Sequence, residues 1–349
     1  MRKTVITAVL LAGMALTAQL SGTFSGMLRE RLIYCMQTLI PSIFGCMLLA
    51  DILCRSGCMN AGRILRRIAQ ILHLPASVSG IFAVSQIAGY PVGAALLKQE
   101  CERGSLSAES ARRFTAVCFG GGPAFLVGLA GAQLFGSAAA GWMMLAAAVM
   151  SNFLLLVILP KPPVSVQCAD RAQKISLNAG ILTESVAHTV HALLNICGAV
   201  MLFGMLLTAA DVLHLFDLLS RMLHIPVQTL RPVLAAAADI TQLPAVFRTG
   251  LPYRVLLPLC AGLLSFGGCC AQIQACALGV PGMQFARLTA VRLLAGLLTA
   301  LLTALLVPLI SLPETVPVFA PAFAVSKSGS LLPGVMILCT GLIAAARDS

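Results

Sequence analysis

The chain of 349 residues is 59% hydrophobic and only 10% charged, and its mean hydropathy is +0.95. Soluble domains carry about 25% charged residues, so this composition excludes a mainly soluble protein. Apolar segments long enough to cross a bilayer recur along the sequence, and no polar segment is long enough to form a separate soluble domain. We therefore predict an all-α polytopic membrane protein that works within the lipid bilayer.

The formal net charge of +11 comes from short basic clusters between apolar segments. Such clusters indicate cytoplasmic loops, whereas a nucleic-acid-binding face would combine basic with aromatic residues, so we expect no nucleic-acid partner. Most of the 13 cysteines lie in apolar segments, where cysteine acts as a small hydrophobe. His188 and His191 lack a third ligand for a metal ion. We expect no metal site, no cofactor and, because serine-elbow and zinc-protease motifs are absent, no enzymatic activity.

The N-terminal part of the chain is predicted to form two spans. Residues 1–31 begin with basic residues followed by an apolar run, which predicts an uncleaved membrane span, with a cleaved signal peptide as the alternative. Residues 32–53 form the next predicted span and open a first repeat, residues 32–160. The basic patch at residues 55–67 is expected on the cytoplasmic side. At the other end of the chain, residues 311–349 are expected to form a loop and a last span.

The apolar segment SGIFAVSQIAGYPVGAALL, residues 79–97, is interrupted by Gly89, Tyr90 and Pro91. It could cross the bilayer, or enter and return as a re-entrant hairpin with these three residues at its tip. The net positive charge of the following loop, residues 98–113, favours the hairpin. At such a tip, backbone groups would bind the solute. Tyr90 could stack on an aromatic ring, or it could be an interfacial anchor.

The segment CFGGGPAFLVGLAGAQLFG, residues 118–136, has three glycines and a proline within an apolar run. Each glycine weakens a helix, and proline removes a backbone donor. The span predicted over residues 114–135 is therefore expected to break at Gly121, Gly122 and Pro123. The alternative is that the glycines only allow close packing of helices.

A basic linker, residues 161–184, divides the chain, and residues 185–310 repeat the plan of the first half. The segment SFGGCCAQIQACALGVPG, residues 265–282, resembles the glycine-rich segment above, and DITQLPAVFRTG, residues 239–250, resembles QIAGYPVGAALLKQ, residues 86–99. If each half holds one hairpin and three crossings, the two halves have opposite orientations. We therefore predict an inverted repeat with broken helices or re-entrant hairpins and roughly eight to ten membrane segments.

Asp239, Thr241 and Gln242 are polar residues within the apolar run VLAAAADITQLPAVF. An ionisable side chain in such a run is costly and by default suggests a functional site. Asp239 could bind a coupling cation or a proton, or it could cap the next half-helix.

The second glycine-rich segment supplies further candidates. Gln272 and Gln274 follow Gly267 and Gly268, and their amides could donate to a carboxylate or could satisfy each other across helices. Arg292 lies a few residues into an apolar run. It could supply positive charge to an anionic solute, or its side chain could snorkel to the interface.

The region AGYPVGAALLKQECERGSLSAESARRFTAVCFGGGPAFLVGLAGAQLFG, residues 88–136, resembles the signature region of the YlbJ-type sporulation integral membrane proteins, part of the nucleoside-recognition or Gate superfamily. The resemblance covers roughly residues 32–309 and implies that the two halves are Gate-like repeats. It also implies a role in spore formation, because such proteins are thought to move dipicolinate, a small aromatic dicarboxylate, from the mother cell across the outer forespore membrane. This chain has Phe119, Gly120 and Gly121 where the family tends to have Asn and Ser, so its ligand could differ.

The leading hypothesis is therefore a transporter or facilitator of a small organic anion in a bacterial cell membrane. The alternatives are a transporter of a nucleoside-like or other small polar solute, and a non-transporting scaffold or assembly factor for spore maturation. Other copies of the chain and other sporulation membrane proteins are candidate partners.

Overall fold

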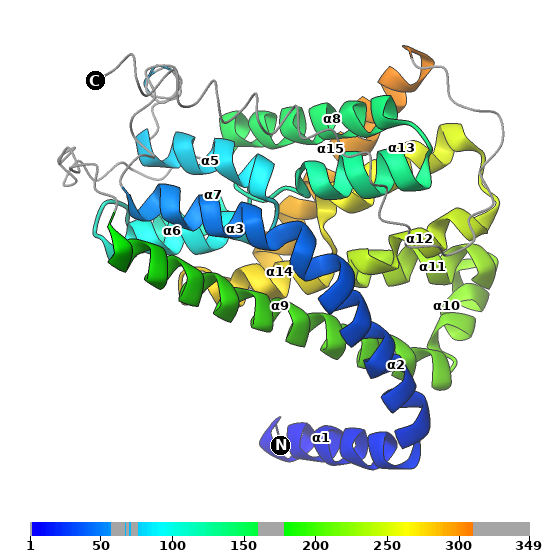
Figure 1. The fold of residues 1–349 in the computed structure, drawn as a ribbon. Helices are drawn as coiled ribbons and strands as arrows, with labels where there is room; N and C mark the ends of the chain where they lie inside the picture. The colour runs from blue at the N-terminus through cyan, green and yellow to red at the C-terminus, as the bar shows by residue number, and fades with distance from the viewer. Residues whose placement is uncertain (1, 57–66, 68–69, 71–75, 160–177, 310–349) are drawn as a thin grey trace. The chain divides into compact units, whose positions relative to one another are not determined.

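The structure is a computed structural model that describes residues 2–56, 67, 70, 76–159 and 178–309 (Figure 1). Within these ranges every regular element is a helix. The predicted last span at residues 311–349 and most of the predicted linker lie outside the described residues.

The helices follow one another in this order: α1 (Arg2–Gln19), α2 (Ser21–Tyr34), the π-helix η1 (Cys35–Leu39), α3 (Ile40–Arg55), α5 (Ala76–Ala88), α6 (Val92–Glu102), α7 (Ala108–Thr115), the π-helix η3 (Ala124–Leu134), α8 (Ala138–Ile158), α9 (Ala179–Val212), α10 (Leu215–Leu223), α11 (Val227–Ala238), the 3-10 turn η4 (Ile240–Gln242), α12 (Leu243–Val246), η5 (Phe247–Thr249), α13 (Tyr253–Phe266), α14 (Gly268–Leu278), α15 (Phe285–Leu306) and η6 (Val307–Leu309).

Polar side chains begin several of these helices. Ser137 Oγ accepts a hydrogen bond from the Ala140 amide at 3.2 Å, and Asn178 Oδ1 accepts one from the Ile181 amide at 2.9 Å. Ser107 caps α7 in the same way. These caps supply acceptors to the first free amides of each helix, which explains where α7, α8 and α9 begin.

By length and composition, four helical stretches in the described part could cross a membrane: Ala138–Ile158, Ala179–Val212, Tyr253–Leu278 and Phe285–Leu309. A fifth results if Ser21–Leu39 and Ile43–Arg55, which meet at 58°, form one broken span. This confirms the prediction of an all-α protein with several membrane-spanning helices. The larger number of membrane segments and the inverted relation of the halves remain predictions.

The break predicted within residues 114–135 is confirmed. Helix α7 ends at Thr115, residues 119–121 are non-helical, and the short apolar helix η3 begins only at Ala124. The glycines at positions 120–122 and Pro123 favour the interruption, because both residue types destabilise a helix interior.

Helix α15 has one apolar exposed face and one buried polar face. Leu297, Leu301 and Leu305 recur every fourth residue and are 61%, 56% and 67% exposed. Thr299 and Thr303 lie on the buried side. Leucines aligned in this way would be unfavourable in water, and they fit a helix that presents one face to lipid.

Helices α13 and α15 approach each other through paired glycines. A Cβ added to Gly296 would lie 2.9 Å from the carbonyl oxygen of Gly262, and a Cβ on Gly262 would lie 3.0 Å from the carbonyl oxygen of Gly296. Small residues at such a crossing let two backbones pack directly on each other. This close contact places α15 against α13, which ends at Phe266 just before Gly267.

We predict that Gly296→Val destabilises the protein by about 2 kcal/mol, because the added side chain overpacks the α13–α15 contact. The measurement is the free energy of unfolding in detergent micelles. Gly198→Val on α9 is the matched control, since nothing lies within 4 Å of a Cβ at that position. Equal stability of the two variants would contradict the proposed close contact.

Candidate functional site

The first interruption joins α5 to α6 and lies against the second interruption of the same half. Tyr90 donates its backbone N–H to the Gly120 carbonyl oxygen at 2.6 Å. Gly122 has φ +65°, and a Cβ there would lie 2.9 Å from the Ile87 carbonyl oxygen. The turn at Gly89–Pro91 and the non-helical stretch at residues 119–121 therefore contact each other through their backbones. Only glycine fits comfortably at position 122.

The second half has an equivalent pair of interruptions. Helix α11 ends at Ala238, and Asp239 is extended before η4 begins. Gly267, with φ +83°, separates α13 from α14. A Cβ on Gly268 would lie 3.1 Å from the Ile240 amide nitrogen, so these two interruptions also contact each other directly.

The two pairs meet at the Phe119 ring. A Cβ on Gly267 would clash with Phe119 and would lie 3.3 Å from the Tyr90 ring. A Cβ on Gly121 would lie 3.6 Å from the Leu264 carbonyl oxygen near the end of α13. Four interrupted segments, two from each half of the chain, are thus packed together at one place.

Arg292 is completely buried and holds the first half's interruption. Its Nη1 donates to the carbonyl oxygen of Ala116 at 2.8 Å and to Asn152 Oδ1 at 2.7 Å. Its Nη2 donates to the carbonyl oxygen of Ser265, and its guanidinium lies 4.9 Å from the centre of the Phe119 ring. The side chain therefore does not snorkel to the surface. Both terminal nitrogens are engaged by the protein itself.

Asn152 and Gln86 extend this network around the same interruption. Asn152 Nδ2 donates to the Phe119 carbonyl oxygen at 3.0 Å and to Gln86 Oε1 at 2.8 Å. Gln86 Nε2 donates to the Val117 carbonyl oxygen at 3.4 Å. Carbonyls that leave a helix in an apolar environment require such donors, and here buried side chains provide them.

Arg31 of α2 binds the second half's interruption. Its Nη1 donates to Thr241 Oγ1 at 2.8 Å and lies 3.6 Å from Asp239 Oδ2, while the Gln242 amide lies against its guanidinium. Asp239 is buried and accepts from the Thr241 amide at 3.1 Å, which caps η4. Of the alternatives open for Asp239, the structure thus shows the cap.

Tyr90 lies in the core, with its ring stacked on Phe119 at 4.9 Å between centres. Its side-chain hydroxyl is buried, and within the described part of the chain it has no hydrogen-bond partner. A buried hydroxyl without a partner is uncommon and calls for an explanation such as a water molecule, an ion or a solute. It is therefore the feature at the meeting point of the four segments that points most directly to a ligand.

The two glutamines of α14 do not satisfy each other. Gln272 Nε2 donates to the Phe266 carbonyl oxygen at 3.0 Å, and Gln272 Oε1 accepts from Thr289 Oγ1 at 2.7 Å. Gln274 Nε2 contacts Cys270 Sγ at 3.2 Å. Gln272 therefore links α14 to α15, next to the Gly267 interruption.

Metal ligands do not gather in the described ranges, where no group of three His, Cys, Asp or Glu side chains could hold an ion. His188 instead contacts Asp51, with Nδ1 and Oδ1 2.8 Å apart.

Reasoning from sequence missed Arg31, Gln86 and Asn152 as members of the site. Gln86 and Asn152 are polar residues in apolar segments, a pattern that marks interior-facing positions in membrane proteins. Arg31 carried no such signal, because it follows other charged residues near the end of an apolar run.

Comparisons with protein-family models, with curated proteins and with solved structures find no match to this chain.

We predict that Arg292→Leu lowers the free energy of unfolding in detergent micelles by at least about 3 kcal/mol, because several buried acceptors lose their donor together. Arg254→Leu is the matched control. Arg254 is exposed, so its replacement is expected to change stability by less than about 0.5 kcal/mol. If Arg292→Leu were as stable as the control, Arg292 would not hold the interruption.

Proposed function

We propose that this chain is a membrane transporter or facilitator of a small organic anion. The observation that carries the proposal is the meeting of four interrupted segments, two from each half, around Tyr90 and Phe119. Interrupted helices are tolerated at membrane depth where they are buried in protein or line a solute path, and paired interruptions mark the binding site in many secondary transporters.

The two arginines support this proposal because each binds an interruption in a distant part of the chain. Arg31, from the first part of the chain, binds the second half's interruption, and Arg292, from the second half, binds the first half's interruption. Movement of one half against the other would alter both sets of contacts. Alternating access of this kind requires two packed units with a site between them.

For the solute we propose dipicolinate, moved from the mother cell across the outer forespore membrane during sporulation. This step rests on the resemblance of residues 88–136 to YlbJ-type proteins. The Gate-like inverted repeat belongs to the same proposal.

A non-transporting scaffold is the second candidate. The terminal donors of Arg292 are occupied by protein acceptors, and the first glycine-rich segment offers no polar side chain from residues 119–121. Both features would also suit an assembly factor in which the interruptions are structural.

Uptake by the wild type separates the two candidates, and Tyr90→Phe tests whether the Tyr90 hydroxyl belongs to the site. Removing a buried hydroxyl without a partner should leave the thermal stability unchanged or raise it, whereas loss of a solute hydrogen bond should lower uptake about tenfold. The measurement is uptake of radiolabelled dipicolinate into proteoliposomes, with a nucleoside as the second solute. Wild-type protein that takes up neither solute would favour the scaffold. If Tyr90→Phe takes up the solute as the wild type does, the Tyr90 hydroxyl does not bind the solute.

Deletion of the gene in its spore-forming host tests the proposed role in the cell. We expect dipicolinate to remain in the mother cell and spores to contain much less of it, because no path would cross the outer forespore membrane. Complementation with wild type should restore the spore content. Spores of the deletion strain that fill normally would contradict the dipicolinate assignment.

A further inference from the structure

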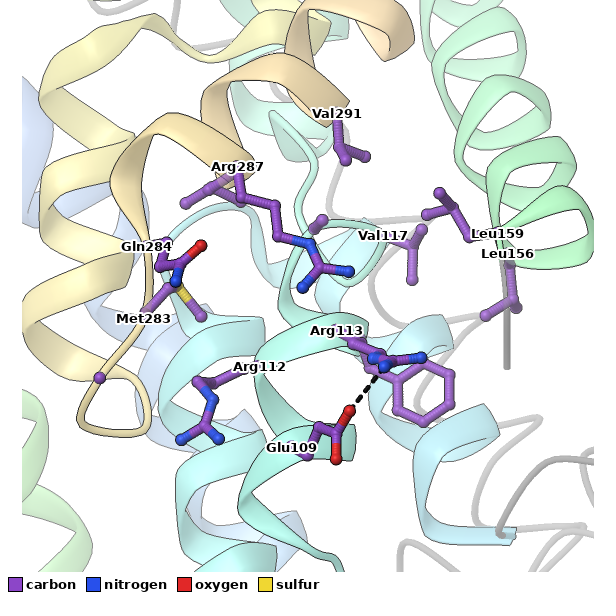
Figure 2. Close-up of a pocket in the computed structure, with 14 residues that line it drawn as sticks. Glu109, Arg112, Arg113, Val117, Leu156, Leu159, Met283, Gln284, Arg287 and Val291 are labelled. Carbon is purple, nitrogen blue, oxygen red and sulfur yellow. Dashed lines mark hydrogen bonds and ion pairs between the residues drawn. The ribbon is translucent and has the colours of Figure 1, made fainter. Parts of the chain in front are cut away.

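A cavity of about 430 Å³ lies beside the first half's interruption, between α7, the end of α8 and the start of α15 (Figure 2). Its volume falls within the range of small-molecule sites. Ala116 and Val117 form part of its lining, and these are the residues whose carbonyls are bound by Arg292 and Gln86. The cavity is therefore in direct contact with the interrupted segment.

Charge in this cavity is predominantly positive. Arg112, Arg113 and Arg287 line it together with one carboxylate, Glu109, so the ionised side chains carry three positive charges and one negative charge. Glu109 Oε1 accepts from Arg113 Nη2 at 2.5 Å. The remaining excess of two positive charges matches a dianion.

Donor groups at the cavity remain unused. Arg113 Nε is buried without a hydrogen-bond partner in the described structure. Arg287 makes no hydrogen bond or ion pair with the described residues, and Figure 2 shows its side chain extending toward Arg113. Arg112 uses one nitrogen on the Pro281 carbonyl oxygen at 3.1 Å and keeps its other donors. Guanidinium groups in such an arrangement bind carboxylates through paired hydrogen bonds.

The rest of the cavity is apolar. Phe114, Leu156, Leu159, Leu288 and Val291 contribute to its lining. A fully hydrated inorganic anion would gain little from such a lining, whereas an organic anion with a compact apolar body would bury its body there.

We propose that this cavity is the entry site for the transported solute, and that it binds a small organic dianion, a dicarboxylate, before the solute reaches the interrupted segments. The assignment as an entry site rests on the proposed transport function, whereas binding of the dicarboxylate does not. A phospholipid headgroup would offer a similar anionic group, and the test must separate these two sources.

The test is equilibrium binding of radiolabelled dipicolinate to the full chain in nanodiscs of neutral lipid. Arg287→Gln and Arg113→Gln should each raise the dissociation constant about tenfold, because each removes a charge-assisted interaction. Arg254→Gln, which changes an arginine outside the cavity lining, should leave it unchanged. Phthalate should displace dipicolinate at least about tenfold better than benzoate, which carries a single charge.

Glu109→Gln should raise the affinity for dipicolinate, a change that misfolding could not produce. Loss of the carboxylate frees Arg113 and raises the excess positive charge, so binding should become several-fold tighter. Unchanged binding in the arginine variants and in Glu109→Gln would overturn the proposal. So would binding of phosphatidylglycerol at this cavity in preference to dipicolinate.

Binding and uptake distinguish this inference from the proposed function. If the wild type binds dipicolinate through the arginines but proteoliposomes take up none, the dianion site stands and transport fails. If uptake occurs and the Arg287 and Arg113 variants transport and bind as the wild type does, transport stands and the entry site is wrong.

Discussion

Backbone hydrogen bonding in an apolar environment is the constraint on which the rest of this structure depends. A helix that stops within the membrane leaves carbonyls and amides that lipid cannot satisfy, and each such group costs several kcal/mol. Here the carbonyls at positions 116, 117 and 119 receive donors from Arg292, Gln86 and Asn152. The buried position of Arg292 follows from this requirement, and so does the close approach of α13 and α15 that brings it there.

The same requirement explains why the halves are interleaved. Each interruption is completed by a side chain from the other part of the chain, and the aromatic rings of Tyr90 and Phe119 fill the space left by the glycines around them. The first half's interruption also receives donors from its own half, Gln86 and Asn152, so contacts within and between the halves complete it together. Stability and the candidate site thus use the same residues, as is expected where polar groups are retained in an apolar core.

Local features of the sequence predicted the interruptions well, because glycine and proline act on the backbone where they occur. The turn at Gly89–Pro91, the non-helical stretch before Pro123 and the break at Gly267 were all indicated in this way. The partners of the interruptions could not be predicted, since Arg31 and Thr241 are 210 positions apart and Arg292 and Asn152 are 140 apart. The burial of Arg292 could not be predicted either. An arginine near the start of an apolar run has a side chain long enough to reach the interface or to turn into the protein core.

The two bridging arginines differ in their electrical environment. Arg31 lies beside the carboxylate of Asp239, so that pair is close to neutral, whereas Arg292 has no carboxylate partner among the residues that the structure describes. If one half moved against the other along the membrane normal, the neutral pair would feel little of the membrane voltage. An uncompensated guanidinium carried through the field would perform electrical work of about 2.3 kcal/mol per 100 mV for a full crossing. The placement of Arg292 would then make the conformational equilibrium voltage-dependent even for an uncharged solute.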